Sequence, residues 1–369
     1  MKVLHINSYY STSNFYYNLY QKQYENNMNI QVYVPVSKEY RNKTLNLGDY
    51  AKVSYCYKKY DRLIFSIKHK KIYQDIIKSY QSMDFDIIHA HSLFSNGYIS
   101  LKLKKKYNIP YIVAVRNTDL NIFFKRMIHL RKLGLEILKE AEKIIFISES
   151  YKDQLLTQYI PQTMYDKLEE KSEVIPNGVD DFWLKNKPKS KKITPKSCVQ
   201  IIYVGVINKN KNIQTTVEAI KILRKRGINT KFTIVGDIKD EKIYSKLNKL
   251  DFISFVPRKN KNELLSIYRE NHIFIMPSIY ETFGLVYVEA MSQGIPIIYS
   301  KNQGFDKQFK EGLVGYSVDC YNSDQIANRI IDILNDYEII SEQCINNSNR
   351  FSWDKLADRY EKIYINSIY

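Results

Sequence analysis

Short apolar runs, typical of β-strands, alternate along this chain with longer segments of helical periodicity. The alternation continues through nearly all of the 369 residues, and it is typical of βαβ units, in which helices connect parallel strands. A chain of this length is too long for one ordinary α/β domain, and its apolar residues, 44% of the total, are enough for two cores. The sequence therefore predicts an α/β fold made of two doubly wound, Rossmann-like domains.

The predicted elements fall into two sets. In the first half we expect strands at 2–7, 30–36, 51–55, 87–90, 111–115, 143–147 and 172–175, and helices at 14–27, 62–79, 97–107 and 127–141. In the second half we expect strands at 199–204, 232–235, 253–255, 273–276, 297–299 and 315–317, and helices at 214–226, 240–250, 261–270 and 323–335. The lysine-rich, proline-flanked stretch from Lys185 to Lys196 is typical of a surface linker. The two sets predict an N-terminal domain over 1–180 and a C-terminal domain over 181–348.

Cysteine usage and hydropathy limit the class of protein. The four cysteines are far apart, with no CxxC and no Cys/His spacing typical of zinc sites, and they predict reduced thiols in a cytosolic protein: Cys56, Cys198, Cys320 and Cys344. The segment Met1 to Asn7 predicts a strand directly, so we expect no signal peptide. No run approaches 18 apolar residues, so we expect no membrane-spanning helix.

Positive charge is concentrated in one part of the chain. Lys and Arg number 56 against 39 acids, and between Lys52 and Lys132 there are 17 basic and 5 acidic residues, a net of +12. The basic clusters, 58–62 and 68–71 among them, are interleaved with aromatic residues. They are typical either of a solvated surface or of a face that docks on anionic lipid head groups, where each cation contributes about 1 kcal/mol. No nucleic-acid-binding module accompanies the charge, so we favour a membrane surface over nucleic acid.

Several enzyme classes lack their fingerprints here. The first strand-to-helix turn, Asn7 to Asn14, contains no glycine, and the second domain opens with Val204-Gly205-Val206-Ile207-Asn208. Neither is the Gly-x-Gly-x-x-Gly of a nicotinamide enzyme. The chain also has no P-loop Lys-Ser pair and no Gly-x-Ser-x-Gly, which argues against ordinary kinases, ATPases and serine hydrolases.

Two glutamates eight residues apart, Glu281 and Glu289, form the most informative local pattern. An apolar strand precedes Glu281, the turn Phe283-Gly284 follows it, and Glu289 lies in a helical pattern that leads to the next strand. This layout places two carboxylates and the free N–H groups of a helix start at the carboxyl end of a parallel strand, where phosphates and sugar hydroxyls bind. Two acids on an ordinary surface helix, or an acid/base pair as in sugar hydrolysis, are the alternatives.

Seven segments together carry a resemblance to one known family, in its order and spacing. They are Ile87-Ile-His-Ala-His91, Ser148-Glu-Ser150, Val174-Ile-Pro-Asn-Gly-Val-Asp180, Val204 to Lys211, Ile234-Val-Gly-Asp237, Pro277 to Pro296 and Phe351-Ser-Trp353. With them the chain resembles the retaining glycosyltransferases of the GT-B fold, family 4 (glycosyl transferases group 1). The resemblance implies two Rossmann-like domains that face each other across a cleft, with an acceptor site in the first domain and a nucleotide-sugar site in the second. It also implies that the amphipathic helix at about 349–369 crosses back to complete the first domain.

The resemblance implies a separate role for each glutamate. Glu289 matches the family's second glutamate, whose carboxylate accepts hydrogen bonds from the ribose hydroxyls of the donor. Glu281 matches the first, which lies against the donor sugar and the reacting region. Gly304, at the end of the following strand, is expected to close the donor pocket.

The diphosphate of the donor requires positive charge and N–H groups. The backbone N–H groups of Phe283, Gly284 and Leu285 are expected at a helix start, where the helix dipole favours phosphate or sugar oxygens. Lys211 matches the family lysine that pairs with the diphosphate. Because neutralising this charge helps the leaving group to depart, the resemblance implies that neither a metal nor another cofactor is needed. An exposed lysine in a lysine-rich loop is the alternative for Lys211.

One position departs from the family pattern. The family usually has an arginine directly after the glycine that is Gly205 here, but this chain has Val206. One phosphate contact is therefore missing, or it is supplied by another residue such as Lys209 or Arg258.

The first domain contributes two further candidates. His89 and His91 follow an apolar strand, and because they are two residues apart we expect their rings on opposite faces, with His91 directed into the cleft, in either a structural or a catalytic role. The family's His-Gly-Thr-Asp becomes Arg116-Asn-Thr-Asp119 here, so an arginine replaces the histidine near the transferred sugar. Arg116 either pairs with Asp119 or binds a phosphate or other anionic group of donor or acceptor bidentately, and we favour the second.

The expected function is therefore a metal-independent retaining glycosyltransferase of the hexosyltransferase class. It would move a sugar from a nucleoside diphosphate sugar to a hydroxyl acceptor by a front-face mechanism. The basic N-terminal surface favours a polyprenyl-diphosphate-linked saccharide as acceptor, in bacterial capsule or lipopolysaccharide synthesis at the cytoplasmic face of the membrane. The alternatives are a GT-B-shaped nucleotide-sugar-binding or scaffold protein without turnover, and a sugar-nucleotide epimerase.

Overall fold

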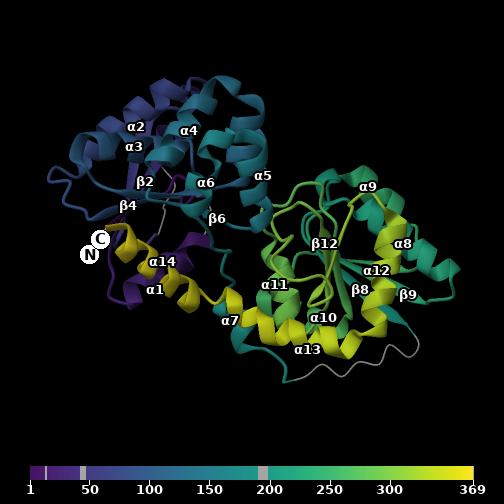
Figure 1. The fold of residues 1–369 in the computed structure, drawn as a ribbon. Helices are drawn as coiled ribbons and strands as arrows, with labels where there is room; N and C mark the ends of the chain where they lie inside the picture. The colour runs from purple at the N-terminus through teal and green to yellow at the C-terminus, as the bar shows by residue number, and fades with distance from the viewer. Residues whose placement is uncertain (13–14, 42–46, 190–197, 369) are drawn as a thin grey trace. The chain divides into compact units, whose positions relative to one another are not determined.

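The chain folds into two compact units, each built on one parallel sheet (Figure 1). The computed structural model describes residues 1–12, 15–41, 47–189 and 198–368. Unit 1 comprises Met1–Ile147, Tyr151–Pro176 and the chain from Trp353 onward, and unit 2 comprises Ser148–Ser150 and Asn177–Ser352. The predicted α/β fold of two Rossmann-like domains is thereby confirmed.

Unit 1 contains a parallel sheet in the order β3-β2-β1-β4-β5-β6-β7. Its strands are β1 (Lys2–Ile6), β2 (Asn29–Ser37), β3 (Ala51–Tyr57), β4 (Ile87–Ala90), β5 (Tyr111–Val115), β6 (Lys143–Phe146) and β7 (Ser172–Val174). Its α-helices are α1 (Phe15–Glu25), α2 (Phe65–Ser79), α3 (Ser95–Tyr107), α4 (Arg131–Glu140), α5 (Glu149–Tyr159), α6 (Gln162–Glu170) and α14 (Trp353–Ile368). Every residue of β4 and β5 is buried, as expected for central strands covered by helices on both faces.

The last helix completes the core of unit 1. In Figure 1, α14 lies beside α1 at the opposite end of the sequence. Trp353, Leu356, Tyr360 and Tyr364 are all buried in the same apolar cluster as residues of β1, β2 and β4. The prediction that the C-terminal helix belongs to the first domain is therefore confirmed.

Unit 2 contains a second parallel sheet, in the order β10-β9-β8-β11-β12-β13. Its strands are β8 (Val199–Val204), β9 (Thr230–Val235), β10 (Ile253–Val256), β11 (Ile273–Met276), β12 (Ile297–Ser300) and β13 (Gly315–Val318). Its α-helices are α7 (Asp181–Lys185), α8 (Ile213–Lys225), α9 (Glu241–Leu247), α10 (Lys261–Glu270), α11 (Leu285–Ser292), α12 (Ser323–Asn335) and α13 (Tyr337–Ser348). Strands β8, β11 and β12 are neighbours, so the loops that follow them meet at one edge of the sheet.

Several element boundaries differ from those predicted. The helix predicted from residue 62 begins at Phe65, because the Asp61 carboxylate accepts the backbone N–H of Lys58 at 2.7 Å and holds a separate 3-10 turn over Lys59–Leu63. The helix predicted from 127 begins at Arg131, and the last helix begins at Trp353 after a 3-10 turn. The predicted linker at 185–196 lies outside the described residues from 190 onward. Within the described ranges, no helix has the length and apolar character needed to cross a membrane.

Candidate functional site

Two loops of unit 2 bring the predicted donor-site residues together. The loop after β8 contains a 3-10 turn, η5 (Lys209–Lys211), and the loop after β11 leads to α11. Asn210 joins the loops, because its carbonyl accepts the N–H of Ile279 at 2.8 Å and its side chain bonds the backbone of Tyr280 at 2.9 and 3.1 Å. The loops that carry Lys211 and Glu281 are therefore held against each other at the carboxyl end of the sheet.

Lys211 and Glu281 form an ion pair. The Nζ of Lys211 lies 2.5 Å from Oε2 of Glu281, and the two side chains are only 20% and 13% exposed. Ser278 Oγ donates to the same carboxylate at 3.4 Å, and the Asn208 side chain accepts the Lys211 N–H at 3.1 Å, which fixes the turn that carries the lysine. Lys211 is thus not a freely solvated lysine, which was the alternative open at the sequence level.

The residues suggested as replacements for the missing arginine lie apart from this ion pair. Lys209 is exposed, and the side chain of Arg258 is 80% exposed with its nearest acid, Asp237, at 4.0 Å. Gly205 follows β8 with a φ of +155°, and an added Cβ would lie 2.7 Å from the Tyr203 hydroxyl. The glycine is therefore required by the backbone path, and a phosphate contact from Lys209 or Arg258 stays a prediction.

The start of α11 offers N–H groups without protein acceptors. Gly284 precedes the helix with a φ of +78°, and a Cβ there would meet the Tyr287 ring at 2.4 Å, so only glycine fits. Among the described residues, the N–H groups of Phe283, Gly284 and Leu285 have no hydrogen-bond acceptor. The Phe283 side chain is buried against other rings, so its contribution to a ligand would come from its backbone. Three free donors at a helix start suit a phosphate or a sugar oxygen.

Gly304 lies directly against the Glu281 loop. Its N–H donates to the Glu281 carbonyl at 3.0 Å, and a Cβ on Gly304 would be 1.7 Å from the Thr282 carbonyl oxygen. The neighbouring Gln303 side chain accepts the Glu281 N–H at 3.0 Å. The segment after β12 therefore fixes the backbone that presents Glu281, and a role of Gly304 in closing the donor pocket stays a prediction.

Glu289 lies in a different electrostatic environment from Glu281. It belongs to the second turn of α11, where the buried Tyr268 hydroxyl donates to its Oε2 at 3.3 Å. Burial raises the pKa of Glu289 to about 7, while the Tyr268 bond and the charge of Lys261 act in the opposite direction. The two glutamates therefore have separate partners, which argues against a shared acid/base pair.

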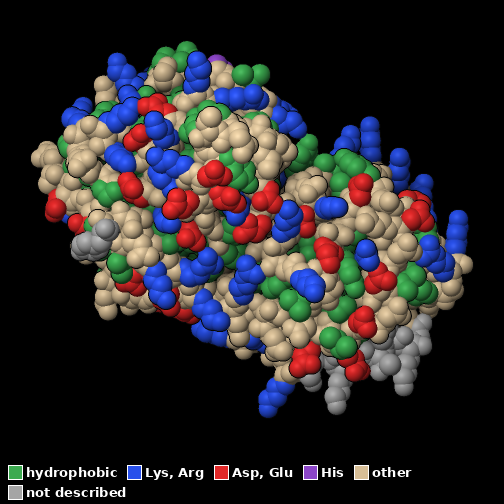
Figure 2. Space-filling view, viewed as in Figure 1, with side chains coloured by type: hydrophobic (Ala, Val, Ile, Leu, Met, Phe, Trp, Pro, Cys, Tyr) green, Lys and Arg blue, Asp and Glu red, His purple; other side chains and the backbone are tan. Residues whose placement is uncertain are grey.

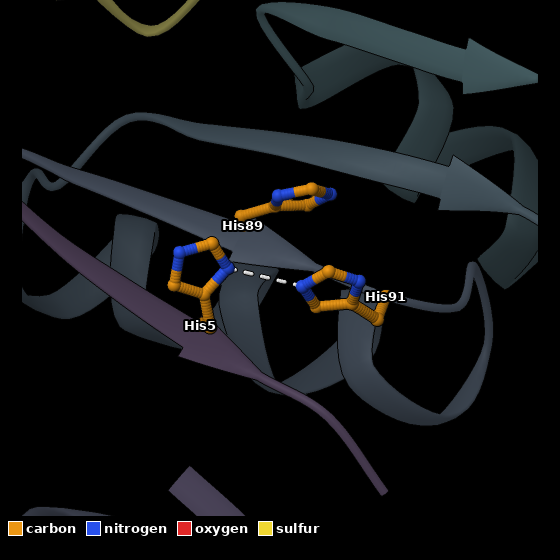
Figure 3. A group of neighbouring side chains, drawn as sticks. All are labelled: His5, His89 and His91. Carbon is orange, nitrogen blue, oxygen red and sulfur yellow. Dashed lines mark hydrogen bonds between the residues drawn. The ribbon is translucent and has the colours of Figure 1, made fainter. Parts of the chain in front are cut away.

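Three histidines form a buried cluster in unit 1 (Figure 3). His5 in β1 and His91 point toward each other, with His5 Nδ1 3.0 Å from His91 Nε2, and the Tyr20 hydroxyl is 3.1 Å from the same Nε2. The His89 ring stacks on that of His91 with centroids 3.9 Å apart, and its Nδ1 is 2.8 Å from the Tyr364 hydroxyl. Burial lowers the pKa of His5 to about 3 and those of His89 and His91 well below their ordinary value, so all three rings are neutral.

The prediction that the rings of His89 and His91 lie on opposite faces was wrong. Strand β4 ends at Ala90, so the alternation of side chains no longer sets the direction of His91, and both rings lie on one side. His91 is 0% exposed, so its ring does not face a cleft. Sequence reasoning also missed His5, which pairs with His89 through the β1–β4 register. The available signal was a histidine in the first strand, since the sheet pairs this strand with the one that contains His89.

The cluster has some features of a metal site. The ligand atoms of its three histidines lie within 4.8 Å of one another, and neutral imidazole is the form that binds metals. However, the rings of His89 and His91 are within 23° of parallel, so their in-plane lone pairs do not converge on one point. A shared ion would require a ring to rotate, and the arrangement as it stands is a hydrogen-bonded core network.

Arg116 follows β5 and lies beside this cluster. It is 9% exposed, and its Nε donates to the His91 carbonyl at 3.3 Å. The Asp119 carboxylate instead accepts three backbone N–H groups, those of Leu93 at 3.1 Å, Phe94 at 3.2 Å and Arg116 at 2.8 Å. The described residues include no ion pair between the side chains of Arg116 and Asp119, but their charges act on each other electrostatically, so anion binding by Arg116 stays a prediction.

Unit 1 also has a surface on which cationic and apolar side chains are mixed. Lys and Arg side chains are spread over the part of the unit that carries α2, α3 and α4, with hydrophobic side chains between them (Figure 2). The exposed residues around the start of α2 include a group of cations and aliphatic side chains, which we call the basic–apolar surface: Lys58, Lys59, Arg62, Leu63, Ile64 and Ile67. Leu63 is 87% exposed. Lys71, which we also expected to be available, is instead paired with Asp61 at 2.7 Å.

Comparison with known proteins matches both halves of the chain. Residues 13–181 match the model of Glycosyltransferase Family 4, and residues 185–351 match that of Glycosyl transferases group 1. An uncharacterized glycosyltransferase of Methanocaldococcus jannaschii is 27% identical over 316 residues, which are 83% of this chain and 82% of that protein.

Solved structures show the same fold. The lipopolysaccharide outer core galactosyltransferase WaaB in its apo form has a TM-score of 0.76 at 17% identity, covering 100% of this chain and 99% of that one. Anabaena HepE, in complex with UDP, has a TM-score of 0.73 at 15% identity, covering 99% of this chain and 100% of that one. With the two family matches together spanning most of the sequence, the chain belongs to the GT-B glycosyltransferases of family 4 and is a glycosyltransferase.

Proposed function

We propose that the chain is a retaining glycosyltransferase that uses a nucleoside diphosphate sugar and needs no metal. The observation that carries the proposal is the Lys211–Glu281 ion pair, with a 2.5 Å N–O distance, beside the free N–H groups at the start of α11. One cation and several N–H donors at the carboxyl end of a parallel sheet suit a diphosphate. HepE, a neighbour in fold, is known in complex with UDP, which supports a uridine nucleotide as the first donor to test.

In the proposed reaction, different residues of unit 2 bind the ribose, the sugar and the diphosphate of the donor. Glu289 accepts hydrogen bonds from the ribose hydroxyls, and Glu281 faces the donor sugar. The bond between the anomeric carbon and the diphosphate oxygen breaks, while the acceptor oxygen bonds to the same face of that carbon. The acceptor's proton passes to an oxygen of the leaving diphosphate, so no enzymatic base is required. Lys211 and the N–H groups of 283–285 offset the negative charge that develops on the leaving group.

Mutation of Glu289 tests the donor site. Glu289→Ala is expected to raise the KM for the donor or to lower turnover strongly, because the ribose loses its hydrogen-bond acceptor. Glu338→Ala, an exposed glutamate on α13, is the matched control and should behave as the wild type. Retention of full activity by a folded Glu289→Ala protein would contradict the assignment of the donor site.

A chelator tests metal independence. Activity that persists in the chelator supports metal independence, whereas activity that is lost and then recovers on addition of a divalent ion contradicts it.

Product analysis separates transfer from the other roles of this fold. A transferase releases nucleoside diphosphate only when an acceptor is present and takes up the sugar. A binding or scaffold protein releases none under any condition, and an epimerase changes the nucleotide sugar without any acceptor.

For the acceptor, we propose a polyprenyl-diphosphate-linked saccharide presented at the cytoplasmic face of the membrane, in bacterial surface polysaccharide synthesis. The support is the basic–apolar surface, on which exposed Leu63 and Ile64 directly follow the exposed cations Lys58, Lys59 and Arg62 in the sequence. Cations attract anionic head groups and apolar side chains enter the interface, so this combination suits a lipid surface better than bulk water. WaaB, a fold neighbour, is a lipopolysaccharide galactosyltransferase, in agreement with this class of product.

Sedimentation with anionic vesicles tests the membrane proposal. The wild type should sediment at low salt and be released as salt rises. Replacing the three cations of the basic–apolar surface by glutamine should weaken sedimentation by more than a variant that loses three exposed lysines of unit 2: Lys242, Lys246 and Lys249. Equal losses in the two variants would mean that net charge, and not this surface, governs binding.

A further inference from the structure

The exposed aliphatic side chains of this protein are concentrated on two segments of unit 1. Leu63, Ile64 and Ile67 lie around the start of α2, and Ile122 and Ile128 lie in the segment that follows β5. The other large aliphatic side chains that are exposed among the described residues are spread over both units: Met1, Ile238, Ile339 and Ile365. Single exposed aliphatic residues are ordinary, whereas a concentration of them marks an interaction site.

The second of these segments leaves the sheet at its carboxyl edge. It contains the π-helical turn η3 (Asp119–Phe124) and the 3-10 turn η4 (Ile128–Leu130) and follows shortly after β5. Asp119 fixes its start, because the carboxylate accepts the N–H groups of Leu93 and Phe94 from the loop after β4. Open parallel sheets bind their ligands at this edge, so the segment borders the region where the proposed function needs an acceptor.

Aromatic packing holds the two segments side by side. The Phe65 ring at the start of α2 and the Phe123 ring in η3 have centroids 6.2 Å apart. Phe65 also packs on Tyr98 of α3, and Phe123 stacks on Phe94, with centroids 5.5 and 4.5 Å apart. The residue directly before each of these two phenylalanines is an exposed isoleucine, so the aliphatic side chains of both segments belong to one surface.

The charges on this surface have one sign. Within 58–70 and 119–132, all of which the structure describes, the only acids are Asp61 and Asp119, and they are 4% and 1% exposed. We call the exposed cations and aliphatic side chains of the two segments the insertion surface. Its aliphatic members are the five side chains named above, and its cations are Lys58, Lys59, Arg62, Lys70, Lys125, Arg126 and Lys132.

This combination suits an anionic lipid surface better than a protein partner. Leu63 is 87% exposed, so it protrudes instead of lining a groove, and protruding apolar side chains can enter the boundary between head groups and acyl chains. The cations beside it attract anionic head groups. A second copy of the chain is a poor partner, because a two-fold interface would place the same cations opposite each other.

We propose that the insertion surface holds the protein on an anionic leaflet by burying aliphatic side chains of both segments among the lipids, with the cations at the head groups. The proposal rests on the membrane part of the proposed function, and it adds the segment 119–132 and apolar insertion to it. Because this segment starts at the carboxyl edge of the unit 1 sheet, insertion brings that edge to the lipid surface.

Vesicle binding by matched variants tests the proposal. The full chain is sedimented with vesicles of equal parts phosphatidylcholine and phosphatidylglycerol over a series of salt concentrations. Ile122→Ser with Ile128→Ser should weaken binding by at least about fivefold at every salt concentration, because two apolar side chains no longer enter the lipid. The control is Ile339→Ser with Ile365→Ser, whose isoleucines are 65% and 43% exposed against 64% for Ile128 and 46% for Ile122. Equal binding by the two double variants overturns the proposal.

Fluorescence reports the insertion itself. The native tryptophans, Trp183 and Trp353, are both buried, so Ile128→Trp adds a separate signal. Its emission should shift to shorter wavelength on the anionic vesicles and be quenched by lipids with brominated chains, whereas Ile339→Trp in unit 2 should show neither change. Unchanged emission from vesicle-bound Ile128→Trp overturns the proposal even if the serine variants do not fold.

The outcomes also separate this proposal from the proposed function. If the wild type binds the vesicles but Ile128→Trp shows no shift, the contact is electrostatic and insertion fails alone. If the wild type binds no vesicles, the membrane part of the proposed function fails together with insertion, while UDP-glucose binding to unit 2 still tests sugar transfer. If light scattering shows a dimer that Ile122→Ser with Ile128→Ser abolishes, the surface belongs to a second copy and the proposal is overturned.

Discussion

The partly buried carboxyl of Glu289 should make donor binding depend on pH. Burial raises its pKa from 4.5 to about 7, against the opposing effects of Tyr268 and Lys261. An ionised carboxylate has only acceptor sites, whereas the protonated form has lost acceptor capacity to its O–H. The carboxylate is therefore the form suited to hold two ribose hydroxyls. Because the pKa is raised, this form dominates only above about pH 7, and donor affinity should fall as pH decreases through that value.

The size of the effect follows from the ionised fraction. With a pKa of about 7, that fraction is about 0.9 at pH 8, about 0.5 at pH 7 and about 0.1 at pH 6. If only the ionised form binds, the apparent Kd is the intrinsic Kd divided by this fraction. The apparent Kd should therefore rise about tenfold between pH 8 and pH 6, equivalent to about 1.4 kcal/mol.

Calorimetry with UDP-glucose at constant ionic strength measures this dependence. A nucleotide sugar is preferable to free UDP, because its diphosphate has no group that titrates in this range. Titrations at pH 7 in buffers of different ionisation enthalpy should also reveal about half a proton released for each donor bound, since binding draws the protonated fraction into the ionised form.

Glu289→Gln is the decisive control for the pH effect. The amide is close in shape to the carboxyl and does not titrate, so its apparent Kd should be the same at pH 6 and pH 8. A wild-type Kd that stays constant over this range would refute the reasoning about Glu289. A slope that persists in Glu289→Gln would assign the titration to another group.

Three further changes concern the same unit. Tyr268→Phe removes the hydroxyl that donates to Glu289 at 3.3 Å. Because that hydrogen bond lowers the pKa of Glu289, its loss should move the midpoint of the donor-binding pH profile to a higher pH. An unchanged or lower midpoint contradicts this prediction. Lys211→Met removes the positive charge that we propose lies beside the leaving group, and it should lower kcat by at least about 100-fold in steady-state assays of folded protein. A near-normal kcat would place the diphosphate elsewhere. Gly304→Ala places a Cβ 1.7 Å from a backbone carbonyl oxygen and should lower the melting temperature by several degrees, and an unchanged melting temperature would show that the loop yields freely.

Much of the fold was predictable because its strands are continuous apolar runs. β4, β5, β8 and β11 were predicted with the bounds that the structure has, since parallel strands covered on both faces are mostly apolar. Helix α13 was missed, because its buried side includes Ser341, Cys344 and Ser348 beside its apolar residues, so its apolar periodicity is weak. The short helix α7 was missed too, although Asp180 caps it through the N–H of Phe182 at 2.9 Å.

The site was predictable where its residues lie in one segment or in one family motif. Glu281, Gly284 and Glu289 belong to a single strand–loop–helix stretch, so their spacing in the sequence already describes their arrangement. The bond between His5 and His91 depends instead on the register between β1 and β4, which no local pattern specifies. Two of the backbone partners of Asp119, the N–H groups of Leu93 and Phe94, come from the start of another βα loop, which no local pattern around Asp119 specifies.

The ion pair of unit 2 implies a competition that a further variant can reveal. Lys211 is already neutralised by Glu281 at 2.5 Å, so an incoming diphosphate must share the lysine with that carboxylate or take it over. The carboxylate therefore opposes diphosphate binding, while the resemblance gives it a role toward the transferred sugar. A carboxylate at this position favours catalysis only if it stabilises the transition state of sugar transfer by more than it weakens diphosphate binding.

Glu281→Gln should separate these two effects. The neutral amide no longer competes for Lys211, so free UDP should bind about two- to fivefold more tightly at pH 8, as expected for the loss of a partly exposed ion pair. Turnover should fall at the same time, because the group that we propose faces the sugar has lost its charge. A purely structural role of Glu281 would not give tighter UDP binding together with a lower kcat, because a distorted loop would weaken both UDP binding and turnover. If UDP binds the variant more weakly than the wild type, the carboxylate supports the diphosphate site, and the competition inferred from the ion pair is wrong.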